Sequence, residues 1–385
     1  MKVTLLTGFL GAGKTTTLSR IIRDHNITEK FGVIVNDLSD LEVDGELIRN
    51  GDFVSENDGT LASITGGSLS DHNRDAFHHA LRKMQGRGLR HILIEASGSS
   101  DPTVIIEELT VFGQIELGAV IALVDARALL HDFDGGLDLA AYANIAESET
   151  PTASHLLARQ LTAASVIALS KSDLVDESAL QKMLRSLAKL NPSATLAACT
   201  YGKLDPRLFI DAPPYNIVEY QIRRGRSAPL TAVSCDIGNT IVRDPRPFHP
   251  QRFYDLYRES LGLGIFRSKG FLWFASRPDQ VLLWNQAGGA MGLELLGTWR
   301  AAVLNDSALL PEERQHLAQQ LAGTHPVFGD RGCELTIIGT TKDREIFCRG
   351  LSECFCTDTE VLWWQQGKSF TDSWPKTIKT ITGLR

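Results

Sequence analysis

Short apolar runs alternate with longer amphipathic segments through the first half of the chain. Six of these runs are rich in Val, Ile, Leu and Ala and have the length of buried strands. They cover residues 3–7, 32–36, 91–95, 119–125, 165–170 and 194–198. Because segments of helical length separate most of them, the pattern predicts an α/β domain with a mostly parallel, helix-covered sheet.

The pattern changes between residues 210 and 230, where three prolines and a basic run interrupt it. These residues are Pro213, Pro214, Pro229 and the run Arg223-Arg224-Gly225-Arg226. We predict a first domain at 1–212, a linker at 213–230 and a smaller α+β domain with a mixed sheet at 231–385. The basic run is either a solvated segment or a patch that binds a partner.

The predicted second domain combines short strands with two helices. Strand-like runs cover 270–275, 280–284 and 334–338, and helical patterns cover 250–261 and 311–321. The two parts of the chain therefore have different architectures.

A glycine-rich run, G-F-L-G-A-G-K-T, directly follows the first strand at residues 8–15 and has the spacing of a phosphate-binding loop. Gly8, Gly11 and Gly13 permit backbone conformations in which successive N–H groups, including that of Ala12, surround phosphate oxygens. A helix predicted over 15–23 directs its N-terminal dipole at the same anion. The run predicts a nucleotide triphosphate site.

Three side chains at the end of this run have distinct predicted roles. Lys14 supplies a positive charge to the β- and γ-phosphates, and Thr15 offers its hydroxyl to a magnesium ion that bridges them. Thr16 completes the set of nucleotide-binding residues in the loop.

The strand at 91–95 ends in a carboxylate, Glu95, and Gly98 follows three residues later. In phosphate-loop proteins a carboxylate at this place reaches magnesium directly or through water, and such a glycine offers its N–H to the γ-phosphate. We therefore predict that Lys14, Glu95 and Gly98 form the catalytic set. No catalytic glutamine or arginine finger stands out, so we expect slow intrinsic turnover.

The run Leu169-Ser170-Lys171-Ser172-Asp173 is similar to the N-K-x-D signature for guanine. Asp173 can accept two hydrogen bonds from the guanine edge, and the Lys171 stem can pack along the purine face. Ser170 replaces the usual asparagine and shortens the bridge between the base and the phosphate loop. The alternative is that Asp173 is an ordinary helix N-cap.

The ordered motifs resemble those of the CobW-like phosphate-loop GTPases, and the resemblance extends over nearly the whole chain. They are T-G-F-L-G-A-G-K-T-T at 7–16, V-N-D at 35–37, I-E-A-S-G-S-S-D-P at 94–102, L-V-D at 123–125, S-K-S-D-L at 170–174, R-P-F-H-P-Q-R-F at 246–253, K-G-F-L-W at 269–273 and G-D-R at 329–331. The resemblance implies a slow GTPase whose nucleotide state governs metal handling or partner binding.

The chain departs from the family pattern at the metal motif. Ile64, Gly66 and Gly67 stand at the cysteine positions of the family's C-x-C-C, so capture of a soft metal there loses its chemical basis. Asp37 and Asp40, on a segment that could order with GTP, are the remaining oxygen ligands for magnesium or a weak zinc site, with Glu42 and His72 as further donors. The alternative is a solvated acidic loop.

Other clusters give weaker metal signals. His78 and His79 are adjacent on a predicted helix and point apart, and Cys354 and Cys356 offer only two thiols. The segment around His131 favours a polar loop.

Composition narrows the class of protein further. The 385 residues carry a formal net charge of -7, which gives no electrostatic reason to expect nucleic acid binding. No run approaches the roughly 18 apolar residues that span a bilayer. The six cysteines all lie in the second half and show no disulfide pattern, which is typical of a reduced cytoplasmic protein.

Three functions fit these motifs. The first is a GTP-hydrolysing, nucleotide-switched metallochaperone or metal-homeostasis factor of the zinc or cobalt class, which uses GTP and Mg²⁺ and delivers Zn²⁺ or another divalent metal to a client metalloprotein. The second is a GTP-dependent activator of a client without its own transition-metal site. The third is a small-molecule kinase, which Asp173 disfavours. The sequence leaves the oligomeric state open.

Overall fold

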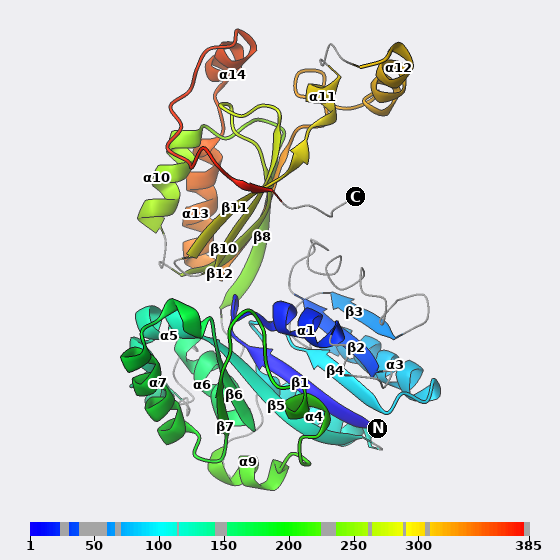
Figure 1. The fold of residues 1–385 in the computed structure, drawn as a ribbon, viewed down its shortest axis with the longest axis vertical. Helices are drawn as coiled ribbons and strands as arrows, with labels where there is room; N and C mark the ends of the chain where they lie inside the picture. Colours follow the sequence, from blue (N-terminus) through cyan, green and yellow to red (C-terminus); the bar gives the residue numbers. More distant parts are fainter. Residues whose placement is uncertain are drawn as a thin grey trace. The chain divides into compact units, whose positions relative to one another are not determined.

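The computed structural model describes residues 1–23, 31–37, 60–65, 71–113, 115–142, 152–224, 236–260, 264–287, 290–304 and 309–380. The chain divides into two compact units, Met1–Asp236 and Ile237–Arg385. Figure 1 shows a helix-covered sheet in each unit.

The first unit contains a seven-stranded parallel sheet in the order β3-β2-β4-β1-β5-β6-β7. Its strands are β1 (Lys2–Gly8), β2 (Phe31–Asp37), β3 (Leu61–Thr65), β4 (His91–Glu95), β5 (Glu116–Asp125), β6 (Val166–Ser170) and β7 (Thr195–Ala198). The six strands predicted from the apolar runs are confirmed, and β3 is an additional edge strand. The parallel, helix-covered α/β architecture is also confirmed.

Helices cover both faces of this sheet. They are α1 (Lys14–Ile22), α3 (Asp71–Gly86), α4 (Pro102–Phe112), α5 (Ala126–Asp132), α6 (Ala153–Ala163), α7 (Glu177–Leu190), α8 (Arg207–Ile210) and α9 (Ile217–Arg224), with short 3-10 turns at Asp134–Gly136, Leu139–Tyr142 and Ser172–Leu174. Side chains of α1 and α8 pack on one face. Side chains of α3, α4 and α6 pack on the other.

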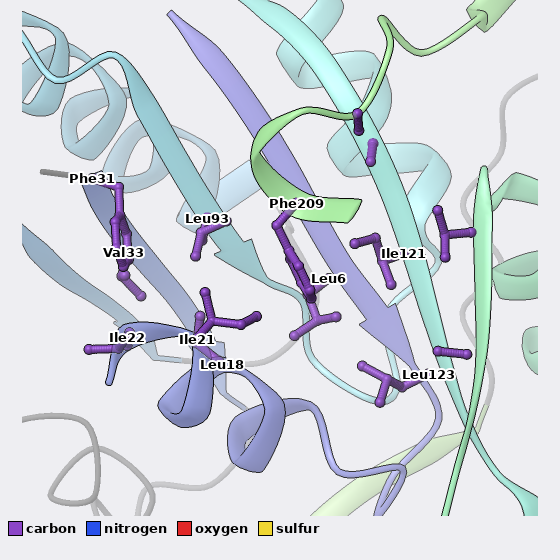
Figure 2. Packing of buried hydrophobic residues seen from close by; sticks show 14 of the residues in the cluster. Leu6, Leu18, Ile21, Ile22, Phe31, Val33, Leu93, Ile121, Leu123 and Phe209 are labelled. Carbon is purple, nitrogen blue, oxygen red and sulfur yellow. The ribbon is translucent and has the colours of Figure 1, made fainter. Parts of the chain in front are cut away.

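The apolar side of α1 joins the phosphate loop to the core. Figure 2 shows Leu18, Ile21 and Ile22 turned toward Val33 and Leu93 of the sheet. All five side chains are less than a tenth exposed. Burial of this helix face fixes the direction of α1, and thereby the end of the loop that precedes it.

The segment predicted as a linker, 213–230, contains α9. Tyr215 donates a hydrogen bond of 2.6 Å to the carbonyl oxygen of Ala163, and the hydroxyl groups of Tyr220 and Thr103 are 2.7 Å apart. These contacts hold residues 215–220 on the first unit, whereas residues 225–235 lie outside the described part.

The second unit contains a six-stranded mixed sheet in the order β13-β11-β10-β9-β12-β8. Its elements are β8 (Ile237–Asp244), α10 (Pro250–Ser260), β9 (Ile265–Leu272), β10 (Gln280–Ala287), β11 (Ala290–Thr298), α11 (Arg300–Val303), α12 (Pro311–Gln320), β12 (Cys333–Thr340), α13 (Thr341–Cys354), α14 (Asp358–Gln365) and β13 (Lys379–Thr380). The predicted α+β class is confirmed. Helices α10 and α13 lie side by side on one face of the sheet (Figure 1), over a core rich in aromatic rings.

Among the described residues, no helix combines the length and the apolar composition needed to span a membrane.

Candidate nucleotide site

The glycine-rich loop runs from the end of β1 to the start of α1. Gly8, Gly11 and Gly13 have φ values of 136°, 78° and 90°, which side chains strongly disfavour. At Gly8 a Cβ atom would also lie 2.1 Å from the carbonyl oxygen of Leu123. The sequence therefore needs glycine here for two reasons, the backbone conformation and the close approach of β5.

Lys14 begins α1 and is 8% exposed. Its Nζ donates hydrogen bonds to the carbonyl oxygens of Gly8, at 2.8 Å, and Phe9, at 3.1 Å. The ammonium group thus lies within the curve of the loop, at the positive end of the helix dipole. This arrangement suits an anion held by the loop.

Thr15 and Glu95 come together from two elements. The Thr15 hydroxyl donates a hydrogen bond of 2.6 Å to Oε1 of Glu95, and Glu95 is 5% exposed. Both groups present the hard oxygen atoms that magnesium prefers, so the residues fit that ion. The next side chain, Thr16, is exposed.

Gly98 lies in the loop that links β4 to α4 and packs against the phosphate loop. A Cβ atom at position 98 would lie 2.9 Å from the backbone nitrogen of Leu10. Only glycine therefore permits this approach, which brings the third member of the predicted catalytic set to the same edge of the sheet.

The predicted base-recognition residues lie at the end of β6. The Ser170 hydroxyl contacts the carbonyl oxygens of Ala12, at 2.7 Å, and Val124, at 3.2 Å. Lys171 has a φ of 53° and forms an ion pair of 2.5 Å with Asp125. The serine at position 170 is shorter than the usual asparagine, but its hydroxyl still contacts the phosphate loop at Ala12.

Asp173 is exposed in the turn Ser172–Leu174. The N-cap of α7 is Asp176, whose side chain accepts a hydrogen bond of 2.8 Å from the backbone of Ala179. The capping alternative for Asp173 therefore does not apply to α7. Burial, with a smaller effect from Asp173, raises the pKa of the Cys199 thiol to about 11.

The structure describes only some of the residues that the sequence predicts as metal ligands. The side chains of Asp37 and His72 and the whole of Asp40 and Glu42 lie outside the described residues, as do Gly66 and Gly67. Ile64 is 5% exposed and belongs to the apolar cluster between the sheet and α3.

Within the described part of the chain, no group of three or more His, Cys, Asp or Glu side chains could hold a metal ion. The Nε2 atom of His78 lies 2.9 Å from Oε2 of Glu108, whereas His79 is exposed. Cys354 and Cys356 are buried, and burial raises the pKa of each thiol to about 12, which keeps both protonated near neutral pH.

Asn36 is a residue that the sequence analysis did not single out by itself. It lies at the end of β2, is 4% exposed, and neither atom of its side-chain amide has a hydrogen-bond partner among the described residues. Its position directly before Asp37, at a polar strand end, was the available signal.

Both units match models of known protein families. Residues 2–198 match the family model for the CobW/HypB/UreG nucleotide-binding domain, and residues 237–355 match the cobalamin synthesis protein cobW C-terminal domain.

Curated relatives cover most of the chain. The chain is 28% identical over 406 residues to the zinc-regulated GTPase metalloprotein activator 1 of Dictyostelium discoideum, over 97% of this chain and 83% of that protein. It is 28% identical over 298 residues to the zinc chaperone YjiA of Escherichia coli (strain K12), over 73% of this chain and 84% of that protein. Among solved structures, Zn(II)-bound YjiA GTPase from E. coli aligns with 92% of this chain and 99% of that chain, at 20% identity and a TM-score of 0.36.

Proposed function

The chain belongs to the CobW/HypB/UreG family of P-loop GTPases, and we propose that it hydrolyses GTP to GDP and phosphate as a nucleotide-switched metal-homeostasis factor of the zinc or cobalt class. A client metalloprotein is the proposed partner. The names of the relatives, an activator of metalloproteins and a zinc chaperone, support this class.

The observation that carries the proposal is the contact between Thr15 and Glu95. Two oxygen atoms that can coordinate a metal ion lie 2.6 Å apart. One belongs to Thr15 on the helix that follows the phosphate loop, and the other belongs to Glu95 at the end of a buried strand. A structural role alone would not require a carboxylate that is 5% exposed at this edge of the sheet. The pair is suited to a cation that accompanies the phosphates.

Each proposed site residue has one task. The loop N–H groups from Gly11 to Lys14 orient the phosphates, and the Lys14 ammonium balances their charge. Thr15 and Glu95 would hold magnesium, which supplies charge neutralisation on the β- and γ-phosphates when bound. Gly98 donates its N–H to the γ-phosphate and so distinguishes GTP from GDP.

Base selection depends on Asp173 in this proposal. An exposed carboxylate that does not cap α7 is available to accept two hydrogen bonds from guanine. Ser170 and Lys171 support it, because Ser170 contacts Ala12 and Lys171 is held by Asp125.

Hydrolysis is tested by phosphate release from GTP with magnesium. We expect slow turnover in the unaltered chain, and a loss of at least about 100-fold in Lys14→Ala, since the charge on the transferred phosphate is left unbalanced. Lys182→Ala, on the exposed side of α7, is the matched control and should retain full activity. Near-normal turnover in Lys14→Ala would refute the proposed site.

A second candidate, a GTP-dependent activator with no transition-metal site of its own, is favoured by one observation. Ile64, at the first cysteine position of the usual motif, packs in the apolar core with Phe77 and Ile34. Zinc and cobalt titration with magnesium and a non-hydrolysable GTP analogue separates the two candidates. Tight, stoichiometric binding supports metal delivery, and its absence supports the activator.

The same titration on a variant with cysteine at positions 64, 66 and 67 tests whether the scaffold can hold a thiolate site. Thiolates favour zinc and other soft metals, so the variant should gain zinc affinity if the three positions converge. The variant Ile64→Cys alone is the control, because a single thiol provides only one ligand.

A further inference from the structure

Gln160 lies on α6 and is completely buried, with 0% exposure. Its Nε2 donates hydrogen bonds to two carbonyl oxygens of the loop that follows β4. They are those of Gly98, at 3.3 Å, and Ser100, at 3.2 Å. One side chain therefore holds two alternate peptides of the loop that carries Gly98.

This loop, residues 96–101, is fixed at both ends as well. The backbone nitrogen of Ala96 donates a hydrogen bond of 2.9 Å to the carbonyl oxygen of Leu6. At the other end, Arg159 pairs with Asp101 at 2.8 Å, and the Asp101 side chain is 1% exposed. Because Arg159 and Gln160 are adjacent on α6, this helix holds both the middle and the end of the loop.

The loop lies between α6 and the phosphate loop. Gly98 approaches Leu10 so closely that a Cβ atom would lie 2.9 Å from its backbone nitrogen. Gln160 holds the carbonyl group of the same residue. A rotation of the peptide that follows Gly98 must therefore break its hydrogen bond with Gln160, while the Cα of the same residue stays packed against Leu10.

Packing alone does not explain a glutamine at this position. Its Oε1 is buried and has no hydrogen-bond partner among the residues that the structure describes. An unsatisfied buried oxygen is destabilising, and the neighbouring buried positions of α6 include Leu156, Leu157 and Leu161. The buried amide therefore destabilises the fold relative to a leucine at this position, which points to a role for the two hydrogen bonds that its nitrogen makes.

We propose that Gln160 is a positioning residue that holds the peptide following Gly98. Through the Gly98 Cα it thereby orients the preceding peptide, which carries the Gly98 N–H, and so controls how well the site distinguishes GTP from GDP. The inference rests on the proposed function, in which Gly98 contacts the γ-phosphate. Gln160 acts through the loop and needs no contact with the nucleotide.

The test replaces Gln160 with methionine, which has a similar length but no amide donor. Affinities for GDP and for a non-hydrolysable GTP analogue are measured by calorimetry, together with the turnover of GTP. In Gln160→Met the preference for the analogue over GDP should fall by about tenfold, within the usual range of coupling between two sites. Affinity for GDP should stay within about twofold, because the groups that hold the α- and β-phosphates are unchanged.

The matched control is Gln181→Met on α7, where the amide is exposed and donates a hydrogen bond of 2.8 Å to Glu177 of the same helix. It should leave both affinities and turnover unchanged. A second variant, Arg159→Met, removes the other anchor from the same helix and should also lower the preference for the analogue.

Equal losses of affinity for GDP and for the analogue in Gln160→Met would show a purely structural role and overturn the inference. If Gln160→Met does not fold, a normal preference for the analogue in Arg159→Met would overturn it as well. So would an unchanged preference in a folded Gln160→Met. Failure of the unaltered chain to bind or hydrolyse GTP would instead reject the proposed function, so the two failures are distinguishable.

Discussion

The hydroxyl of Ser170 lies 2.7 Å from the carbonyl oxygen of Ala12 and donates a hydrogen bond to it. This contact joins the end of β6, where the predicted guanine motif begins, to the middle of the phosphate loop. Ser170 is 3% exposed, so water does not compete freely for the bond. A hydrogen bond within the protein therefore connects the segment proposed to bind the base with the loop proposed to bind the phosphates.

Replacing Ser170 with alanine should weaken both folding and nucleotide binding. The carbonyl oxygens of Ala12 and Val124 lose their side-chain donor, which should lower the free energy of unfolding by about 1–3 kcal/mol. Urea denaturation measures the first effect, and GDP titration should show weaker binding because the phosphate loop is less well held.

The control for this prediction is Ser186→Ala, which removes a hydroxyl that bonds within helix α7 at 3.2 Å. It should change the free energy of unfolding little and leave GDP binding unaltered. Equal behaviour of the two variants would show that the contact between Ser170 and Ala12 has no role in the site.

Asp173→Asn should reduce the preference for GTP over ATP by at least about tenfold, because a hydrogen bond to a charged acceptor contributes about 1.5–3 kcal/mol. Competition of GTP and ATP for the protein, measured by displacement of a fluorescent GDP analogue, gives the ratio. The turn at Ser172–Leu174 exposes Asp173, so the substitution should not disturb the fold.

Asp176→Asn provides the comparison for Asp173, since it changes the same chemical group three residues later. Asp176 caps α7 through the backbone of Ala179. That variant should retain the preference for GTP, because asparagine also caps helices well. A preference that is unaltered in Asp173→Asn would exclude guanine recognition by this carboxylate.

Thr15→Val should lower GTP turnover by about 100-fold and raise the magnesium concentration needed for half-maximal activity. The substitution removes the hydroxyl that contacts Glu95 at 2.6 Å while it keeps the shape of the side chain. Thr15→Ser, which restores the hydroxyl, should recover most of the activity. Magnesium titrations of the hydrolysis rate measure both effects.

Thr110→Val serves as a second control for this prediction, because Thr110 is an exposed residue of α4 whose hydroxyl bonds within its own helix, to the carbonyl oxygen of Ile106. We expect a much smaller change in the magnesium requirement. If Thr15→Val required no more magnesium than the unaltered chain, the proposed metal role of Thr15 would be wrong.

The sequence predicted the strands whose apolar residues are continuous, and it missed those whose pattern is interrupted. The strand β4 was placed with its observed bounds because all five residues are buried. In contrast, β8 contains Gly238 and Asn239, which weaken a strand pattern, and β3 is a short edge strand with two small residues, Ala62 and Ser63.

In the candidate site, too, the residues that could be predicted are those with a local sequence motif, and the residue that was missed depends on tertiary packing. The phosphate loop and Glu95 were predicted because their spacing along the chain carries the information. Gln160 was not, because nothing in the local sequence of α6 indicates that its amide faces the carbonyl of Gly98, 62 residues earlier. Such a contact follows only from the packing of α6 beside the loop.

The buried His91 lies at the start of β4, at the edge of the sheet opposite the proposed nucleotide site. It should make the free energy of unfolding sensitive to acid. Burial, with a smaller effect from Lys2, lowers the pKa of His91 from 6.5 to about 4, and its Nε2 lies 3.1 Å from the hydroxyl of Thr4. Between these two pKa values the unfolded chain binds the proton that the folded chain excludes. The resulting stability is therefore complete above about pH 6.5 and is lost as the pH falls toward about 4.

The difference between the two pKa values of His91 corresponds to about 3 kcal/mol in the free energy of unfolding. Urea denaturation of the unaltered chain and of His91→Gln, at pH values across this window, should show a smaller acid loss in the variant by about that amount. His79→Gln, at an exposed position of α3, should lose as much stability as the unaltered chain. Parallel curves for all three proteins would show that acid destabilisation arises from the carboxylates and that His91 contributes nothing to it.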